Sequence, residues 1–182
     1  FEVRRATARG ASGTTVTIVQ SGARDESEHR SRAQEALVRW CRHAKIAIEW
    51  IEQGSAVRVD RPLSLVAPAV VEHREEGLHV LVGPTAGTEL LGGERDGGVN
   101  DLAAFYSRGL TLIETTVGEH ARAGLRFKVE ATELSHTISR DDVIRNRSYT
   151  RALARVDELA GRPLRERLRS DLERAAERVL AI

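Results

Sequence analysis

The chain of 182 residues contains no methionine and a single cysteine, and only 4% of its residues are aromatic. With one thiol, Cys41, it forms no internal disulfide and no thiolate metal cage, so we expect a reducing compartment, the cytoplasm. No run of 18 apolar residues occurs, and the first residues lack the apolar stretch of an export signal, so we expect no membrane association. The formal net charge of +1 gives no long-range attraction to polyanions, and we expect no nucleic-acid binding.

Common motifs of hydrolytic and metal-dependent catalysis are also missing. The sequence has no G-x-S-x-G elbow and no H-E-x-x-H pair, which argues against a classical triad and a zinc protease. Residues 87–98 hold five glycines, but no G-K-[ST] follows them, so we interpret this segment as a loop without chemistry. His73 and His79 could share one face of a sheet, yet two imidazoles without a third ligand make a weak site, and we expect no metal.

The first sixty residues have the pattern of one structural unit. No methionine opens the chain and a strand-like pattern begins at once, so we interpret the sequence as a piece of a longer polypeptide. Two strands are predicted at residues 1–8 and 14–20. Asp25 and Glu28 have the spacing of a capping box, which predicts a helix, and residues 45–52 return to the alternation of a strand. The connector that follows places a domain boundary near residue 60.

Residues 61–182 predict an α+β domain built on a mixed sheet with packed helices. Five apolar runs have the length of strands: 66–72, 78–82, 102–106, 110–117 and 125–132. In the last run we expect the apolar residues Leu125, Phe127 and Val129 to face the core, and the charged residues between them, Arg126, Lys128 and Glu130, to face out. Gly161 and Pro163 separate two amphipathic helices. Over residues 151–182 eight arginines alternate with six carboxylates, which is typical of a solvated face with ion pairs.

One segment combines a helix start with an arginine: Leu-Ser-His-Thr-Ile-Ser-Arg-Asp-Asp-Val at residues 134–143. Ser139 is a favourable N-cap and Asp142 stands at the third helical position, so we expect a fixed first turn with Arg140 at its start. The free N–H groups of a helix N-terminus and the planar arginine fork both suit phosphate oxygens. The alternative is that Ser139 only caps the helix, while Arg140 points to water or pairs with an acidic neighbour such as Asp141.

Four short stretches occur in an order that is known from one protein family. Leu-Arg-Phe-Lys-Val stands at 125–129 and Leu-Ser-His-Thr-Ile-Ser-Arg at 134–140, while Arg-Gly-Leu-Thr-Leu-Ile-Glu precedes both at 108–114. Near the start, Gly-Thr-Thr-Val-Thr-Ile stands at 13–18. The chain therefore resembles the HSP90 family of heat-shock chaperones, of the bacterial HtpG type, in which "R-G-T-K-[IV]-T-L" is followed by "L-R-F" and "L-x-L-N-[VI]-S-R-E". The resemblance is collinear over most of residues 1–147.

The resemblance implies the architecture of a GHKL-type ATPase. Residues 1–60 would be the C-terminal part of the nucleotide-binding domain, and residues 61–182 would be the middle domain. Arg140 would be the middle-domain arginine that reaches the γ-phosphate of ATP, and Thr14 would help to hold the adenine through water. An arginine in this role neutralises charge that develops on the transferred phosphoryl group. The family has a glutamine four residues after this arginine, where the present chain has Ile144.

The resemblance also implies which parts of the ATPase lie outside this chain. The catalytic glutamate, the adenine-binding aspartate and the lid would precede Phe1, and the dimerisation domain would follow Ile182. We therefore expect ATP with Mg²⁺ as the cofactor of a full-length protein that forms a homodimer, and neither a bound nucleotide nor ATPase activity for this chain alone. The expected partners are client proteins and the rest of its own ATPase domain, and the expected function is to couple ATP hydrolysis to client folding.

Two alternatives stay open from the sequence. One is the transducer segment of a DNA mismatch-repair or topoisomerase-type GHKL ATPase. In those enzymes the phosphate sensor is usually a lysine, so Arg140 favours the chaperone. The other is a protein-interaction module without nucleotide chemistry, which predicts that Arg140→Ala leaves ATP turnover unchanged.

Overall fold

The computed structural model describes residues 26–52, 54–85, 101–116, 118–139 and 141–180 of the chain. The chain divides into two compact units, Phe1–Ala36 and Leu37–Ile182. The helix α1, Glu26–Cys41, confirms the helix that the capping-box spacing predicts. The two strands predicted before it, Thr14 and the glycine-rich segment 87–98 lie outside the described residues. The assignment of residues 1–60 to an ATPase domain stays a prediction.

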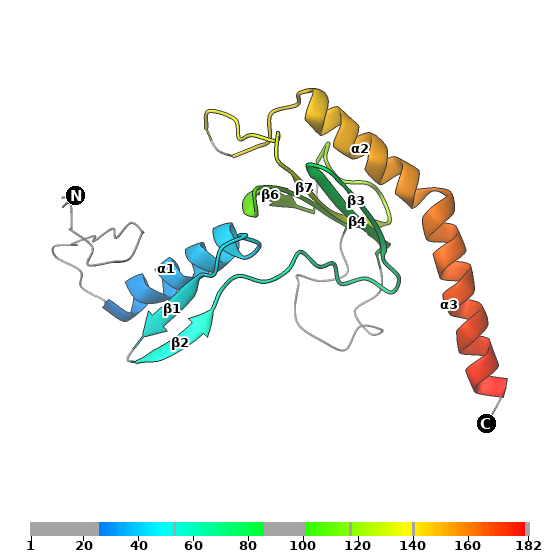
Figure 1. Cartoon of the computed structure of the whole chain (residues 1–182), viewed down its shortest axis with the longest axis horizontal. Coiled ribbons are helices and arrows are strands. Elements are labelled where there is room, and N and C mark those ends of the chain that lie inside the picture. The colour runs from blue at the N-terminus through cyan, green and yellow to red at the C-terminus, as the bar shows by residue number, and fades with distance from the viewer. Residues whose placement is uncertain (1–25, 53, 86–100, 117, 140, 181–182) are drawn as a thin grey trace. The chain divides into compact units, whose positions relative to one another are not determined.

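The second unit is built on a five-stranded mixed sheet (Figure 1). Its strands are β3 Val71–Glu75, β4 Leu78–Pro84, β5 Leu102–Ser107, β6 Leu110–Thr115 and β7 Leu125–Ala131. They lie in the order β3-β4-β7-β5-β6, and only the pair β5 and β7 is parallel. A separate antiparallel hairpin joins β1 Glu49–Glu52 to β2 Ser55–Arg58. The predicted α+β class with a mixed sheet and packed helices is thereby confirmed.

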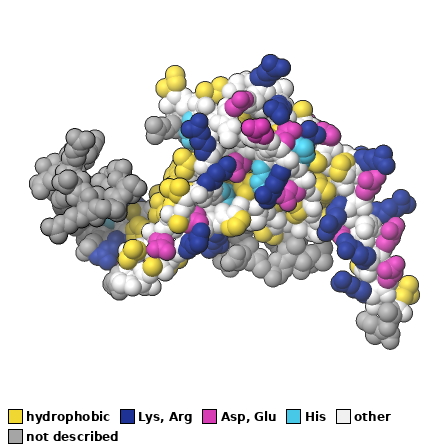
Figure 2. Space-filling view, viewed as in Figure 1, with side chains coloured by type: hydrophobic (Ala, Val, Ile, Leu, Met, Phe, Trp, Pro, Cys, Tyr) yellow, Lys and Arg dark blue, Asp and Glu magenta, His cyan; other side chains and the backbone are white. Residues whose placement is uncertain are grey.

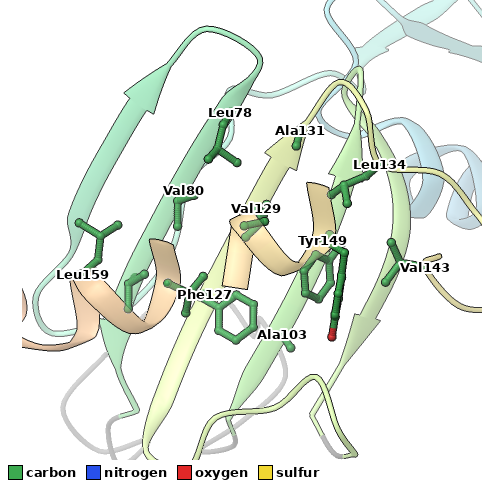
Figure 3. Packing of buried hydrophobic residues seen from close by; sticks show 14 of the residues in the cluster. Leu78, Val80, Ala103, Phe127, Val129, Ala131, Leu134, Val143, Tyr149 and Leu159 are labelled. Carbon is green, nitrogen blue, oxygen red and sulfur yellow. The ribbon is translucent and has the colours of Figure 1, made fainter. Parts of the chain in front are cut away.

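One face of the sheet carries the hydrophobic core, because the apolar residues of its central strands point toward the helix α2, Arg147–Ala160 (Figure 3). Phe127 and Val129 of β7 are fully buried there, as the alternation predicts. From α2, the buried residues Tyr149, Ala152, Val156 and Leu159 meet them. Burial of each large side chain contributes roughly 1.5–3 kcal/mol, so this layer fixes α2 on the sheet.

The opposite face of the sheet is also covered, and here the prediction from alternation is wrong. Arg126 and Lys128 of β7, expected in solvent, are only 5% and 3% exposed. The segment that follows α1 lies over part of this face: the His43 ring packs edge-on against Tyr106 at 4.8 Å, and Lys128 Nζ lies 6.0 Å from the centre of the same ring. Lys45 Nζ lies 2.9 Å from a carboxylate oxygen of Glu130. Alternation shows which residues share a face of a strand, but it does not show whether another segment covers that face.

The turn between β5 and β6 permits this cover. Arg108 and Gly109 both have positive φ, 52° and 80°, as a two-residue turn of the primed type requires. A Cβ atom on Gly109 would lie 2.1 Å from the backbone oxygen of His43, so only glycine leaves room for the segment after α1. The position therefore needs glycine for two independent reasons.

Four further predictions are corrected by the structure. The strand expected at 66–72 begins only at Val71, and the strand expected at 45–52 begins only at Glu49. The helix expected from Ser139 begins at Arg147, because Asn146 supplies the cap and its side chain accepts a hydrogen bond from the Tyr149 N–H. His73 and His79 do not share a face, since His73 pairs with Val80 in the register, and Val80 faces the core. They bind Glu75 and Glu72 respectively.

The helix α3, Arg162–Leu180, follows α2 directly after Gly161, which confirms the predicted break between two helices. Leu164 at its start is buried, whereas Leu172 further along is 70% exposed. Its arginines pair with carboxylates one turn away, as in Arg162–Glu166 and Arg167–Asp171. Figure 2 accordingly shows blue and magenta side chains alternating along α3. The predicted solvated face with ion pairs is confirmed.

Candidate functional site

The two residues predicted to contact the nucleotide, Thr14 and Arg140, both lie outside the described residues. The chain on either side of Arg140 is described, however, and it belongs to the connection between β7 and α2. The candidate site is therefore this connection, and its described residues show how the backbone that leads into and out of position 140 is held.

The connection forms a short hairpin-like loop over residues 135–144. His136 and Val143 form an antiparallel bridge. On one side of it the Thr137 N–H donates to the Asp142 carbonyl at 2.9 Å, and on the other the Ile144 N–H donates to the Ser135 carbonyl at 2.9 Å. The buried Val143 fixes the base of the loop in the hydrophobic core (Figure 3). These two backbone hydrogen bonds form the bridge and bring the two arms of the loop together below its tip.

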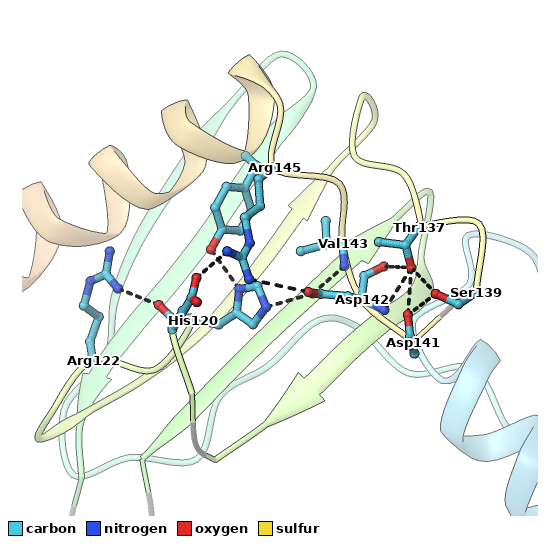
Figure 4. A network of polar contacts seen from close by, with 10 residues as sticks. His120, Arg122, Thr137, Ser139, Asp141, Asp142, Val143 and Arg145 are labelled. Atoms are coloured by element: carbon cyan, nitrogen blue, oxygen red, sulfur yellow. Dashed lines mark hydrogen bonds and ion pairs between the residues drawn. The ribbon is translucent and has the colours of Figure 1, made fainter.

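Side-chain oxygens close the loop a second time, near its tip (Figure 4). The Thr137 hydroxyl donates to a carboxylate oxygen of Asp141 at 2.9 Å, and the Ser139 hydroxyl donates to the same oxygen. These two hydrogen bonds, that from Ser139 first, lower the pKa of Asp141 below its ordinary value, so the group is a carboxylate at neutral pH. Ser139 therefore fixes a turn instead of capping a helix, which corrects the predicted role of this residue.

A buried histidine anchors the outgoing arm of the loop (Figure 4). His120, in the connection between β6 and β7, is 6% exposed. Its Nε2 atom lies 2.8 Å from Oδ1 of Asp142, and its Nδ1 atom lies 2.8 Å from the hydroxyl of Tyr149 in α2. A carboxylate only accepts hydrogen bonds, so Nε2 donates to Asp142, and in the neutral ring Nδ1 accepts the proton of the Tyr149 hydroxyl. One side chain thus joins three segments of the chain.

Aromatic and charged neighbours complete this anchor. The His120 ring packs against Phe105 of the central strand β5, with ring centroids 5.6 Å apart. Asp142 also accepts from the Val143 N–H at 2.7 Å, and its second oxygen lies 3.7 Å from the Arg145 guanidinium. Burial raises the pKa of Tyr149 above its ordinary value, so its hydroxyl keeps its proton. Every polar group of the anchor named here therefore has a partner.

The tip of the loop is open to solvent. Ile138 is fully exposed, at 104% of the reference area, and Ser139 and Asp141 are exposed as well. Ile144, where the resemblance led us to expect a glutamine, is 44% exposed and carries no group that could bind a phosphate. The loop therefore has a rigid base and an accessible tip, which is the arrangement required to present a side chain to a ligand from outside the sheet.

No metal centre forms in the described part of the chain, where no group of three or more histidine, cysteine or acidic side chains comes together. A hollow of about 500 Å³ lies between the turn after β3 and the start of α2. Glu75, Glu76 and Glu133 line it with a single arginine, Arg151, which already pairs with Glu75. An excess of carboxylates disfavours the phosphates of a nucleotide there.

Sequence reasoning missed His120 and Tyr149. A lone histidine in a connection carries no periodicity or motif, and its two partners lie 22 and 29 residues further along the chain. The N-cap at Asn146 could have been identified from the sequence, because asparagine is among the strongest N-cap residues. Ser139 has the same local chemistry, so the local sequence does not distinguish the two residues as caps.

None of the helices in the described part of the chain combines the length and the apolarity that crossing a bilayer requires. Comparison with protein families, with curated proteins and with solved structures gives no match to this chain.

Proposed function

We propose that this chain is a segment of an ATP-dependent chaperone of the HSP90 type, with residues 61–182 as a middle domain of the GHKL ATPase kind. In this function Arg140 contacts the γ-phosphate of ATP that the preceding domain binds, and Thr14 helps to hold the adenine. The observation that carries the proposal is the loop at residues 135–144. Its base is fixed by the bridge between His136 and Val143, and Ser139 and Asp141, the described residues on either side of position 140, are exposed.

A fixed loop of this kind suits the proposed chemistry. Charge develops on the transferred phosphoryl group in the transition state, and a guanidinium stabilises it best when it is held in place before the reaction. The paired hydroxyls of Thr137 and Ser139 on Asp141, together with the anchor at Asp142, reduce the motion of the backbone on both sides of position 140. A preorganised loop loses less conformational entropy when the nucleotide arrives.

The chain departs from the family at Ile144, and the proposal takes this into account. The aliphatic side chain removes one hydrogen bond that the family's glutamine would give to the same phosphate. Phosphate recognition by the middle domain then rests on Arg140 alone. We therefore expect substitution of Arg140 to remove nearly all of the contribution of this domain to ATP hydrolysis.

The remaining parts of the proposed function follow from the resemblance. ATP with Mg²⁺ is the cofactor of the full-length protein, and contact between the tip of the loop and the nucleotide couples ATP binding to closure of the two domains. Closure changes the surface offered to client proteins, which are the proposed partners together with the rest of the ATPase domain. Homodimerisation belongs to the full-length protein.

The test is ATP turnover by the full-length protein with Arg140→Ala, with Arg140→Lys and with Arg169→Ala as the matched control. Arg169 is an exposed arginine of α3 that pairs with Glu173. We expect kcat to fall by roughly 10³-fold in Arg140→Ala, to recover only in part in Arg140→Lys, because lysine lacks the planar fork, and to stay unchanged in the control. Unchanged turnover in Arg140→Ala would contradict the proposed function. DNA binding with a steep salt dependence would instead support the transducer of a DNA-handling ATPase.

A further inference from the structure

The apolar face of α3 is buried only at the start of the helix. Leu164 is 3% exposed and Leu168 is half-buried, and both pack against the core that the sheet and α2 form. Leu172 and Val179 continue the same face at helical spacing but are 70% and 72% exposed, and Ala175 between them is exposed as well. The described residues therefore leave the second half of this apolar face without cover.

The residues of this face have the spacing of a coiled-coil seam. Leu168, Leu172, Ala175 and Val179, which we call the α3 seam, are separated by four, three and four residues, as alternating d and a positions of a heptad are. Two such helices that run antiparallel place each a residue beside a d residue of the other helix. Leu172 then packs beside Ala175, and Leu168 packs beside Val179. In each layer the larger side chain thus meets a smaller one, which permits close packing.

The charged residues beside the α3 seam complement each other in the same antiparallel arrangement. Asp171 and Arg178 hold equivalent positions, seven residues apart, on one flank of the seam. Between antiparallel copies these flanks face each other, so Asp171 lies opposite Arg178 of the partner subunit, and the two-fold axis forms this contact twice. A parallel pair forms neither contact. It would also place Arg165, the a position before Leu168, beside its own copy.

The surroundings of these two residues within α3 favour an outside contact. Asp171 pairs with Arg167 and with Arg174, each about one turn away, and a carboxylate has acceptor sites for further donors. Arg178 lies exposed in the last turn of α3 and forms no ion pair with another described residue. Arg174, four residues before it, carries the same charge, which is unfavourable on a helix. A carboxylate from a second copy therefore stabilises Arg178.

We infer that the exposed half of α3 is an interface between two copies of this chain, in which residues 168–179 pack antiparallel and Asp171 of each copy pairs with Arg178 of the other. The seam has only four layers, and a contact of this size is typical of weak, reversible association. The inference is independent of the proposed function. It also describes a different contact from the homodimer that the resemblance implies, which belongs to a domain that would follow Ile182.

The experiment measures the dissociation constant of the dimer by sedimentation equilibrium of the 182-residue chain over the micromolar range. We expect the wild type to form a monomer–dimer equilibrium. Leu172→Glu should weaken dimerisation by roughly 100-fold or more, because two leucines of each dimer leave the seam and two carboxylates replace them. Leu172 is largely exposed within one copy, so this variant should keep the denaturation midpoint of the wild-type monomer.

Two charge reversals test the direction of the helices. Asp171→Arg and Arg178→Asp should each weaken dimerisation by roughly 10-fold, because each places like charges opposite each other twice. An equimolar mixture of these two variants should dimerise about as tightly as the wild type, since both contacts between unlike variants are then complementary. Any effect of a reversal within its own helix is present with and without the other variant, so the comparison isolates the contact between copies.

Glu177→Arg is the matched control, because residue 177 lies on the side of α3 opposite to the seam, and it should leave the dissociation constant unchanged. A mixture that dimerises no more tightly than its two components would overturn the inference. A dimer that Leu172→Glu leaves intact would do the same. A chain that stays monomeric throughout would show that something other than a second copy covers this face, and it too would overturn the inference. The proposed function is unaffected by any of these results.

Discussion

The guanidinium of Arg42 lies 2.8 Å from the carboxylate of Glu114, although 72 residues separate them in the sequence. The same carboxylate accepts a hydrogen bond from the Tyr106 hydroxyl. Only about a fifth of each charged side chain is exposed. This pair therefore ties the segment that follows α1 to the polar face of the sheet, in a position where water screens it only in part.

Replacement of Glu114 by glutamine should destabilise the protein by about 1–3 kcal/mol, because a half-buried arginine then loses its charged partner while the shape of the side chain is kept. The free energy of unfolding, measured by chemical denaturation, tests this. Glu166→Gln is the control, since the pair Arg162–Glu166 is exposed on α3 and should contribute no more than about 0.5 kcal/mol. Equal losses in the free energy of unfolding for the two substitutions would show that the Arg42–Glu114 pair contributes no more to stability than an exposed ion pair does.

Gly109→Ala should destabilise the protein more than Gly118→Ala. Both glycines have positive φ, 80° and 90°, so alanine pays a similar backbone strain of roughly 1 kcal/mol at each. A Cβ atom at Gly118 has no atom within 4 Å, whereas one at Gly109 would collide with the backbone of His43. We expect an additional loss of about 1–3 kcal/mol at Gly109, measured as the shift of the denaturation midpoint at constant slope. A smaller loss at Gly109 than at Gly118 would contradict the close approach.

Asn146→Ala should cost about 1 kcal/mol of stability, because it removes the cap that accepts from the Tyr149 N–H. Asn146→Asp should restore most of this loss, since aspartate caps equally well. Ser139→Ala should change the free energy of unfolding by no more than about 0.5 kcal/mol, as expected for an exposed residue that caps no helix. Thermal and chemical denaturation of the three variants would measure these differences. A larger loss of stability in Ser139→Ala than in Asn146→Ala would contradict the assignment of the N-cap to Asn146.

The stability of the protein should fall as the pH decreases below neutrality, in part because of His43. Burial lowers the pKa of His43 below its ordinary value, and the charges of Lys128 and Arg42 lower it further, against the hydrogen bond to the Arg61 carbonyl and the charge of Glu114. The unfolded chain therefore binds a proton at a higher pH than the folded protein does. The contribution of neutral His43 to the free energy of unfolding is complete above its ordinary pKa of about 6.5. It is lost as the pH falls toward the lowered pKa that His43 has in the folded protein.

Nε2 of His43 is buried and has no hydrogen-bond partner among the described residues, so a protonated ring would bury an unsatisfied N–H group. The measurement is the free energy of unfolding at about pH 7.5, 6.5 and 5.5 for the wild type and for His43→Asn, which keeps a donor toward the Arg61 carbonyl. We expect the free energy of unfolding to decrease less toward low pH in the variant than in the wild type. An identical dependence on pH in the two proteins would show that His43 does not contribute to this decrease.

Much of the sheet could be predicted from the sequence, because its strands are short apolar runs bounded by turns. The runs at 78–82, 102–106 and 125–132 correspond closely to β4, β5 and β7. Their order in the sheet could not be predicted, since β7, the last strand in the sequence, lies between β4 and β5. Strand order depends on which long-range pairing buries the most apolar surface, and no local pattern records it.

The candidate site was predictable only in its location. The motif at residues 134–143 marks the connection between β7 and α2, but the helix start within it was wrong, because Ser139 and Asn146 both have the chemistry of a cap. The bridge between His136 and Val143 decides between them, since it commits the chain around Ser139 to a hairpin-like loop. The role of His120 depends on two partners that are distant in sequence and therefore left no pattern.

The sequence by itself determined the α+β class, the break between α2 and α3 and the set of residues that share each face of β7, because these depend on backbone conformation and on the period of side chains along one element. The tertiary structure alone decided that Arg126 and Lys128 are buried, that α2 begins at Arg147 and that His120 holds the loop. The physical reason is the same in each case: desolvation and hydrogen bonding depend on which atoms arrive from elsewhere in the chain, and a local pattern carries no information about them.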